Sequence, residues 1–223
     1  MGFRKGELIT MSRCAECGIY ACRVGKLDKA PEHCPMLNCK EVYEEARVAL
    51  QEPDTLRLMH AAAWTEATGY RRWTRMEEIL EFSRKRRFTK LGLAFCSGLV
   101  KEAAEVAKIL KEAGFIVESI ICKTGSVPKE EIGIREDEKI RPGQFEPTCN
   151  PVAQAKILNA AGTELNIALG LCVGHDSVFF KHSNAPVTVL AAKDRVLAHN
   201  PLGVIYASHY HGVRFSRFKQ GTP

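Results

Sequence analysis

From residue 89 onwards, short apolar runs alternate with amphipathic stretches, and this alternation limits the possible folds more than any other feature of the sequence. Four apolar runs read as strands: LGLAFC (91–96), FIVESIIC (115–122), LNIALGLC (165–172) and VTVLAA (187–192). The intervening KEAAEVAKILKEAG and NPVAQAKILNAAG have helical spacing and end on Gly114 and Gly162. Strands that alternate with helices predict an α/β domain over 89–223, with a mostly parallel, doubly wound, Rossmann-like sheet.

Residues 40–88 read as a helical segment that packs on this α/β body. Helix signals cover 40–51, 53–69 and 74–88. Pro53 stands in a first turn, and Thr74 with Glu77 three residues later has the pattern of a capping box.

Three of the strand candidates end in the same way. Cys96, Cys122 and Cys172 each close a strand and are followed within three residues by glycine. Cys149 directly precedes Asn150, which is placed to cap the next helix. Ligands of open α/β sheets bind outside the carboxyl ends of the strands. We therefore expect these four cysteines to share a cofactor-binding site, the alternative being that they are small buried apolar residues.

Upstream of the helices, five cysteines lie close together with the pattern C-x2-C-x4-C-x11-C-P-x3-C. A C-x2-C pair lets two sulfurs reach one metal. Residues 14–39 are therefore expected to form a loop-rich head in which Cys14, Cys17, Cys22 and Cys34 bind metal. Four thiolates suit tetrahedral zinc or a 4Fe-4S iron-sulfur cluster, and the spacing leaves both open. The role of Cys39 also stays open.

The composition and the amino-terminal residues bear on the compartment of the protein. The chain has 223 residues, of which 45% are hydrophobic and 26% charged, as in ordinary globular proteins. It has no apolar run near the roughly 18 residues that a membrane span needs. Residues 1–13 are charged and read as a flexible leader rather than a signal peptide. We expect a cytoplasmic protein, in which clustered cysteines indicate metal or redox chemistry rather than disulfides.

Polar residues after the strand ends are further candidates. Lys123 follows the second strand, and His175 follows the fourth cysteine of the body. The catalytic residues are not fixed by the sequence, and the candidates are Cys122, Lys123, Cys172 and His175. The structural alternatives are a solvated lysine and, at Asp176, the N-cap of a short helix.

Two later groups have two readings each. Lys193, Asp194 and Arg195 either bind a carboxylate or phosphate at the same crevice or make a turn and a salt bridge, and we favour the turn. The histidines at 209 and 211 either touch a metal or belong to a solvated tail, which we favour.

The interval between Cys122 and Cys149 is long, charged and without periodicity. Such a stretch inside a compact domain is usually a functional loop. We expect it to cover the strand-end crevice and to become ordered when a ligand binds.

Seven segments carry a resemblance to a known family: CAECGIYAC, GYRRWTRMEEILEF, AFCSGL, ICKTG, CNPVAQAKILN, LNIALGLCVGHDSVF and APVTVLAAKDRVLAHNP. Over residues 14 to about 206 the chain resembles an uncharacterised family of bacterial and archaeal cysteine-rich proteins, the domain of unknown function 1847, commonly described as metal-binding. The resemblance implies a metal but no reaction. It picks out the same two cysteine groups and says nothing about Cys39.

Three functions follow. The first is a metal-binding protein, with an iron-sulfur cluster or zinc in the head and a second, thiol-lined site at the sheet, acting in redox chemistry with a partner protein. The second is a zinc-stabilised enzyme that uses a strand-end cysteine on a small anionic ligand. The missing G-x-G-x-x-G and P-loop motifs argue against a nucleotide as that ligand. The third, which we disfavour, is a zinc-finger nucleic-acid binder with the basic run 82–90 on the phosphates. A membrane partner is not expected.

Overall fold

A computed structural model describes residues 12–218. The chain divides into two compact units, of which one ends at Trp64 and the other begins at Thr65. We describe each unit by itself. The leader expected for residues 1–13 lies outside the described residues, apart from Ser12 and Arg13. The domain boundaries expected at residues 39 and 88 stay predictions.

The first unit begins with turns and ends in two helices. Three short 3-10 turns, η1 Cys14–Glu16, η2 Ala21–Arg23 and η3 Leu27–Lys29, precede the single-turn helix α1 Pro35–Asn38. Helix α2 is Lys40–Leu50, and α3, Pro53–Gly69, continues across the boundary between the units. The expected loops of the head and both expected helices are therefore present.

The head has almost no apolar core. Among its described residues, 12–39, only Ala21 is buried. Several large apolar side chains are instead exposed: Ile19, Tyr20, Val24 and Leu27. A segment this small and this poor in buried apolar surface needs another source of stability, such as a disulfide or a metal. All nine cysteines are free thiols.

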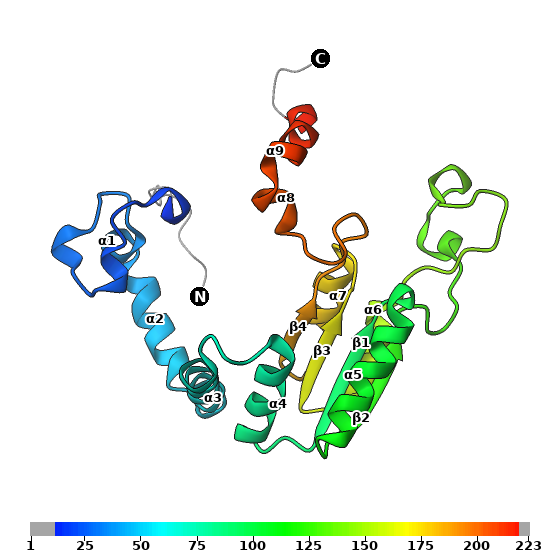
Figure 1. The fold of residues 1–223 in the computed structure, drawn as a ribbon, viewed down its shortest axis with the longest axis horizontal. Coiled ribbons are helices and arrows are strands. Elements are labelled where there is room, and N and C mark those ends of the chain that lie inside the picture. The colour runs from blue at the N-terminus through cyan, green and yellow to red at the C-terminus, as the bar shows by residue number, and fades with distance from the viewer. Residues whose placement is uncertain (1–11, 219–223) are drawn as a thin grey trace. The chain divides into compact units, whose positions relative to one another are not determined.

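The second unit contains a four-stranded, all-parallel sheet (Figure 1). Its strands are β1 Lys90–Phe95, β2 Ile116–Ile121, β3 Leu165–Leu169 and β4 Val187–Ala191, in the order β2-β1-β3-β4. Strand β1 lies in the interior, and the chain crosses from β2 past β1 to reach β3. The expected parallel α/β fold is confirmed.

Helices cover both faces of the sheet. One face carries α4 Arg75–Lys85 and α5 Val100–Glu112, and the other carries α6 Pro151–Ala160 and α7 His175–His182. Successive strand residues point to opposite faces. Leu93 therefore packs with Leu110 of α5, whereas Ala94 packs with Leu158 of α6 and Phe179 of α7. This two-sided burial explains why the strands read as continuous apolar runs.

Two of the three expected helix caps are confirmed. The Thr74 side chain accepts from the backbone N–H of Glu77, whose carboxylate accepts from the N–H of Thr74, so the capping box is present. Asn150 caps α6 by accepting from the N–H of Ala153 at 2.9 Å. The cap expected at Asp176 is wrong. Gly174 is the N-cap of α7, with φ 84°, a left-handed conformation that suits glycine.

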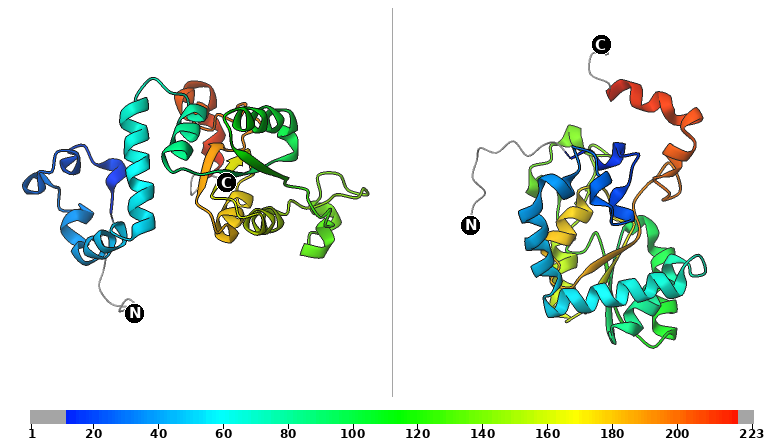
Figure 2. Two further views of the ribbon diagram at one scale, coloured as in Figure 1. Left: turned by 90° about the horizontal axis from the view of Figure 1, so that it is seen from below. Right: turned by 90° about the vertical axis from the view of Figure 1, so that its left-hand side faces the viewer.

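The long interval between Cys122 and Cys149 has a structure of its own. It contains the turns η5 Lys129–Ile132 and η6 Glu136–Glu138. The buried ammonium of Lys139 pairs with Glu130 and Glu136, and this contact lowers the pKa of both carboxyls. The middle of the loop extends away from the sheet in two views (Figures 1 and 2). The loop does not cover the strand ends in this arrangement, and its closure over a bound ligand stays a prediction.

Arginines of α4 make local contacts. Arg84 of the basic run pairs with Glu81 at 2.6 Å, and Arg75, at the start of the helix, donates to the hydroxyl of Thr188 at 2.7 Å. The second contact joins α4 to strand β4.

After β4 the chain continues through α8 Gly203–Tyr206, α9 Ser208–His211 and η7 Gly212–Phe218. The ring of His209 contacts that of Tyr210, with 4.2 Å between centroids. The side chain of His211 is not among those that the structure describes. Across the described residues, no helix combines the length and apolar character that crossing a membrane requires.

Gly92 offers a test of the sheet packing. A Cβ atom at this position would lie 2.0 Å from Oδ1 of Asn166, a buried amide that also bonds to Thr163 and Ser183. We predict that Gly92→Ala lowers the free energy of unfolding by about 1–3 kcal/mol, measured by urea denaturation. Gly203→Ala, where a Cβ meets only ordinary contacts at 3.6 Å, should change it by less than about 0.5 kcal/mol. Equal effects would contradict this account of the packing.

Candidate functional site

Parallel pairing brings the strand-end cysteines to one edge of the sheet. In the register of the strands, Phe95 of β1 lies opposite Ile121 of β2 and Leu169 of β3. Cys96 and Cys122 are the next residues of β1 and β2, and each continues the ladder through its backbone N–H. That of Cys122 donates to Phe95 O at 2.9 Å, and that of Cys96 donates to Leu169 O at 3.1 Å. The two thiols are therefore at the same level of the sheet.

Cys149 joins this pair from the end of the long loop. Its sulfur lies 3.8 Å from the sulfur of Cys122. The backbone N–H of Asn150, the next residue, donates to Cys122 O at 2.7 Å and so fixes the loop end against the strand end. Cys149 thus lies beside the strand-end thiol of Cys122, while a cofactor site shared by all four cysteines stays a prediction.

Gln154 of α6 links the ends of the two strands that carry Cys96 and Cys122. Its buried side-chain amide donates to Ile120 O at 2.7 Å and to Phe95 O at 3.3 Å. One amide thus bonds to the ends of both strands that carry thiols and joins them to the helix that follows Cys149. Sequence reasoning missed Gln154, because a glutamine in an apolar helix gives no sign of what it will contact.

Backbone N–H groups also point at the sulfurs. The N–H of Ser97 donates to Sγ of Cys122 at 3.2 Å, and that of Gly98 donates to Sγ of Cys96 at 3.5 Å. N–H donors of this kind stabilise the thiolate form.

Three cations surround the thiols. Arg195 donates to Sγ of Cys172 at 3.2 Å, and this contact raises the pKa of the arginine. Lys193 hydrogen-bonds to Cys96, and the positive charge of Lys123 acts on Cys149. Lys193 and Arg195 therefore reach the strand-end crevice, and their binding of a carboxylate or phosphate stays a prediction. Asp194 serves the turn, because its carboxylate accepts from the N–H groups of Val196 and Leu197.

The surroundings push two thiol pKa values in opposite directions. A hydrogen bond from Cys122, aided by the charge of Lys123, lowers the pKa of Cys149 to about 6 against the opposing effect of burial. A hydrogen bond to Cys122 and then burial raise the pKa of Cys96 to about 12. Near neutral pH the site therefore holds a thiolate at Cys149 and a thiol at Cys96.

His175 begins α7 beside these groups. Burial, and then the charge of Lys123, lower the pKa of its imidazole. Its Nδ1 is buried, with no hydrogen-bond partner within the described part of the chain. His175 is thus a neutral imidazole with a free ring nitrogen at the thiol site.

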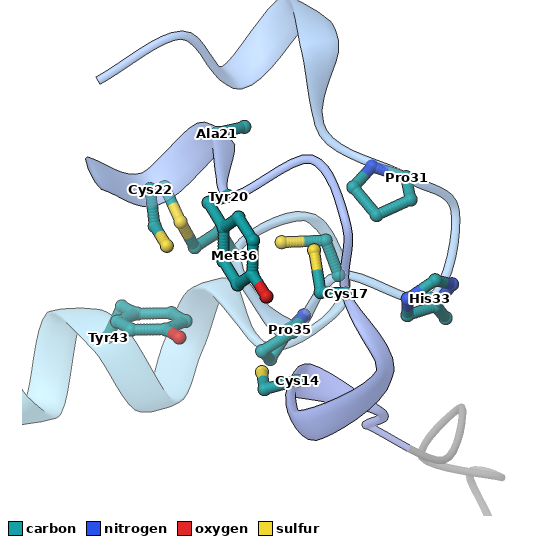
Figure 3. Close-up of a pocket in the computed structure, with 11 residues that line it drawn as sticks. Cys14, Cys17, Tyr20, Ala21, Cys22, Pro31, His33, Pro35, Met36 and Tyr43 are labelled. Atoms are coloured by element: carbon teal, nitrogen blue, oxygen red, sulfur yellow. The ribbon is translucent and has the colours of Figure 1, made fainter. Parts of the chain in front are cut away.

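The four head cysteines line one cavity of about 220 Å³ (Figure 3). Cys14, Cys17, Cys22 and Cys34 reach it from η1, η2 and the start of α1. His33 also lines the cavity, and its Nε2 is buried with no hydrogen-bond partner among residues 12–218. Sequence reasoning missed His33, although its place directly before Cys34 was the available signal.

Neither group of cysteines forms a ready-made site for a single ion in the described part of the chain. Among residues 12–218, no three His, Cys, Asp or Glu side chains are gathered closely enough to hold one metal ion. In the head the thiols surround a space instead of meeting at a point. Cys39 is not among the residues that line this space.

The pKa of Cys149 gives a direct prediction. Because the thiolate is the nucleophile, alkylation of Cys149 by iodoacetamide should rise with pH to a midpoint near pH 6. Lys123→Gln should move this midpoint upwards, because it removes a charge that favours the thiolate. Cys96, with a pKa of about 12, serves as the internal control and should stay unmodified up to pH 8. The measurement is pulsed alkylation with peptide mass spectrometry, and equal reactivity of the two thiols would contradict the assignment.

Comparison with known proteins agrees with the resemblance seen in the sequence. The family described as a protein of unknown function, DUF1847, matches residues 34–190, a shorter span than the 14–206 expected. The match includes all four body cysteines but begins only at Cys34 of the head. An uncharacterised protein of Methanocaldococcus jannaschii is 40% identical over 198 residues, which cover 89% of this chain and 95% of the relative. The chain therefore belongs to the DUF1847 family.

Proposed function

We propose that this protein is an iron-sulfur protein with two sulfur-based sites. The head binds a 4Fe-4S cluster through Cys14, Cys17, Cys22 and Cys34, and the sheet edge provides a second, thiol-lined site. The observation that carries the proposal is the single cavity lined by all four head cysteines, in a segment with almost no apolar core.

Stability supports a metal in the head. With Ala21 as the only buried residue among 12–39, packing contributes little there, and all five head cysteines are free thiols. Metal binding supplies the folding free energy of small domains of this kind. The thiols are the groups in this segment that can bind it.

The spacing of the donors favours a cluster over zinc. Four ligands of one zinc ion each lie about 2.3 Å from it and converge on a point. The head cysteines instead surround a volume of about 220 Å³. A cubane of iron and sulfide fills such a space and takes one thiolate at each of four corners. His33, with a buried and unpartnered Nε2, is positioned to bond to a ligand sulfur and so to tune the reduction potential.

A second candidate is a zinc-stabilised enzyme that uses a strand-end cysteine on a small anionic substrate. The observation in its favour is the group of cations at the sheet edge, Lys123, Lys193 and Arg195. These charges compensate thiolates and would equally attract an anion.

Metal analysis after anaerobic purification separates the two. We predict a brown protein with at least about four iron and four sulfide per chain, and with the broad visible absorption of a cluster. The double variant Cys14→Ser, Cys17→Ser should lose the cluster of the head. A colourless protein that holds one zinc would overturn the proposal in favour of the enzyme.

Cys39→Ser is the matched control, because Cys39 belongs to the same segment but lies outside the cavity lining. It should keep the iron, the sulfide and the spectrum of the unaltered protein. Loss of the cluster in this variant, with retention in the double variant, would show that the ligands are assigned wrongly.

A further inference from the structure

We propose that Cys122 and Cys149 are a dithiol that closes reversibly to a disulfide by exchange with disulfide substrates. This activity belongs to the second unit, goes beyond the cluster proposed for the head and does not depend on it.

The two thiols are already within reach of each other. Their sulfurs lie 3.8 Å apart, and a disulfide needs about 2 Å. The backbone is close as well, because the N–H of Asn150 bonds to Cys122 O at 2.7 Å. A side-chain rotation at the end of the loop can supply the remaining approach, and the sheet need not move.

Exposure assigns different roles to the two cysteines. Cys122 is 2% exposed, whereas Cys149 is half-buried at the end of the loop. A disulfide substrate can therefore reach Cys149 first, whereas Cys122 is shielded from solvent. The N–H of Ser97 donates to the sulfur of Cys122 at 3.2 Å and fixes its position behind Cys149.

The other two thiols of the site have further partners. Cys172 accepts from Arg195 at 3.2 Å, whereas Cys96 accepts from the N–H of Gly98 and hydrogen-bonds to Cys122. Cys122 thus has two sulfur neighbours, and Cys96 is the one that keeps its proton, with a pKa of about 12. Because the thiolate is the nucleophile, Cys149 is the neighbour of Cys122 that can begin the exchange.

The exchange balances without a further reagent. The Cys149 thiolate attacks one sulfur of a disulfide R–S–S–R, a mixed disulfide forms, and one R–S⁻ leaves and takes up a proton. Cys122 then loses its proton, and its thiolate attacks the sulfur of Cys149. The second R–S⁻ leaves, so the protein is oxidised by two electrons and the disulfide is reduced to two thiols.

Oxidation also joins the two ends of the loop. Lys123, next to Cys122, donates to Pro147 O at 2.6 Å, and the N–H of Thr148 donates to Val127 O at 2.7 Å. A covalent bond between Cys122 and Cys149 would thus reinforce a closure that hydrogen bonds already make.

The test uses the full chain under anaerobic conditions, in buffers with increasing ratios of oxidised to reduced glutathione. Intact mass and peptide mapping should show the loss of two hydrogen atoms and a bond between Cys122 and Cys149. On return to reduced glutathione, the bond should open again.

Single variants separate the steps. Cys122→Ser should accumulate a mixed disulfide of glutathione on Cys149, because the second attack is lost. Cys149→Ser should slow the reduction of oxidised glutathione by the cysteines of the second unit at least about tenfold. Cys39→Ser, a cysteine of the first unit outside both sites, should leave the bond and its rate unchanged.

Two results would overturn the proposal: no bond between Cys122 and Cys149 in any buffer, or a preferred bond from Cys149 to Cys96 or Cys172. If a variant fails to fold, differential alkylation of the unaltered protein still identifies which cysteines form the bond. The visible spectrum of the head is followed in parallel, so loss of the cluster and absence of dithiol exchange are recorded separately.

Discussion

The parallel pairing of β1 with β2 and β3 is the constraint on which the sheet-edge site depends. Phe95 stands opposite both Ile121 and Leu169, so the residues that follow emerge at one level. Cys96 and Cys122 extend this ladder through their own N–H groups, and Gln154 bonds to the ends of both strands. The backbone pairing alone therefore places the thiols of Cys96 and Cys122 close together, without a bound ligand.

The two units are stabilised in different ways. The sheet is covered on both faces by helices, and residues such as Leu93, Leu158 and Ile167 are fully buried. The head has Ala21 as its only buried residue among 12–39 and places its cysteines around a cavity. The thiols of the sheet edge are thus held by a fold that stands without them, whereas those of the head are proposed to hold their own segment together through a cluster.

Local signals predicted most of the fold but only part of the site. Apolar runs, the Asn150 cap and the Thr74 capping box depend on neighbours in sequence, and each was recognised. The contacts of Arg195 with Cys172 and of Gln154 with two carbonyl groups join residues far apart in sequence, which no local pattern records. The charge of the long loop is a similar case, because its pairing within the loop through Lys139 is visible only in the structure.

The closed base of the 123–148 loop has an evolutionary consequence. Hydrogen bonds at its two ends fix where the chain leaves the sheet and where it returns, independently of the residues between them. The entropic cost of lengthening a closed loop grows only slowly with its length. Relatives can therefore be expected to insert, delete or rewrite residues here, and so to acquire different outer surfaces over an unchanged pair of sulfurs.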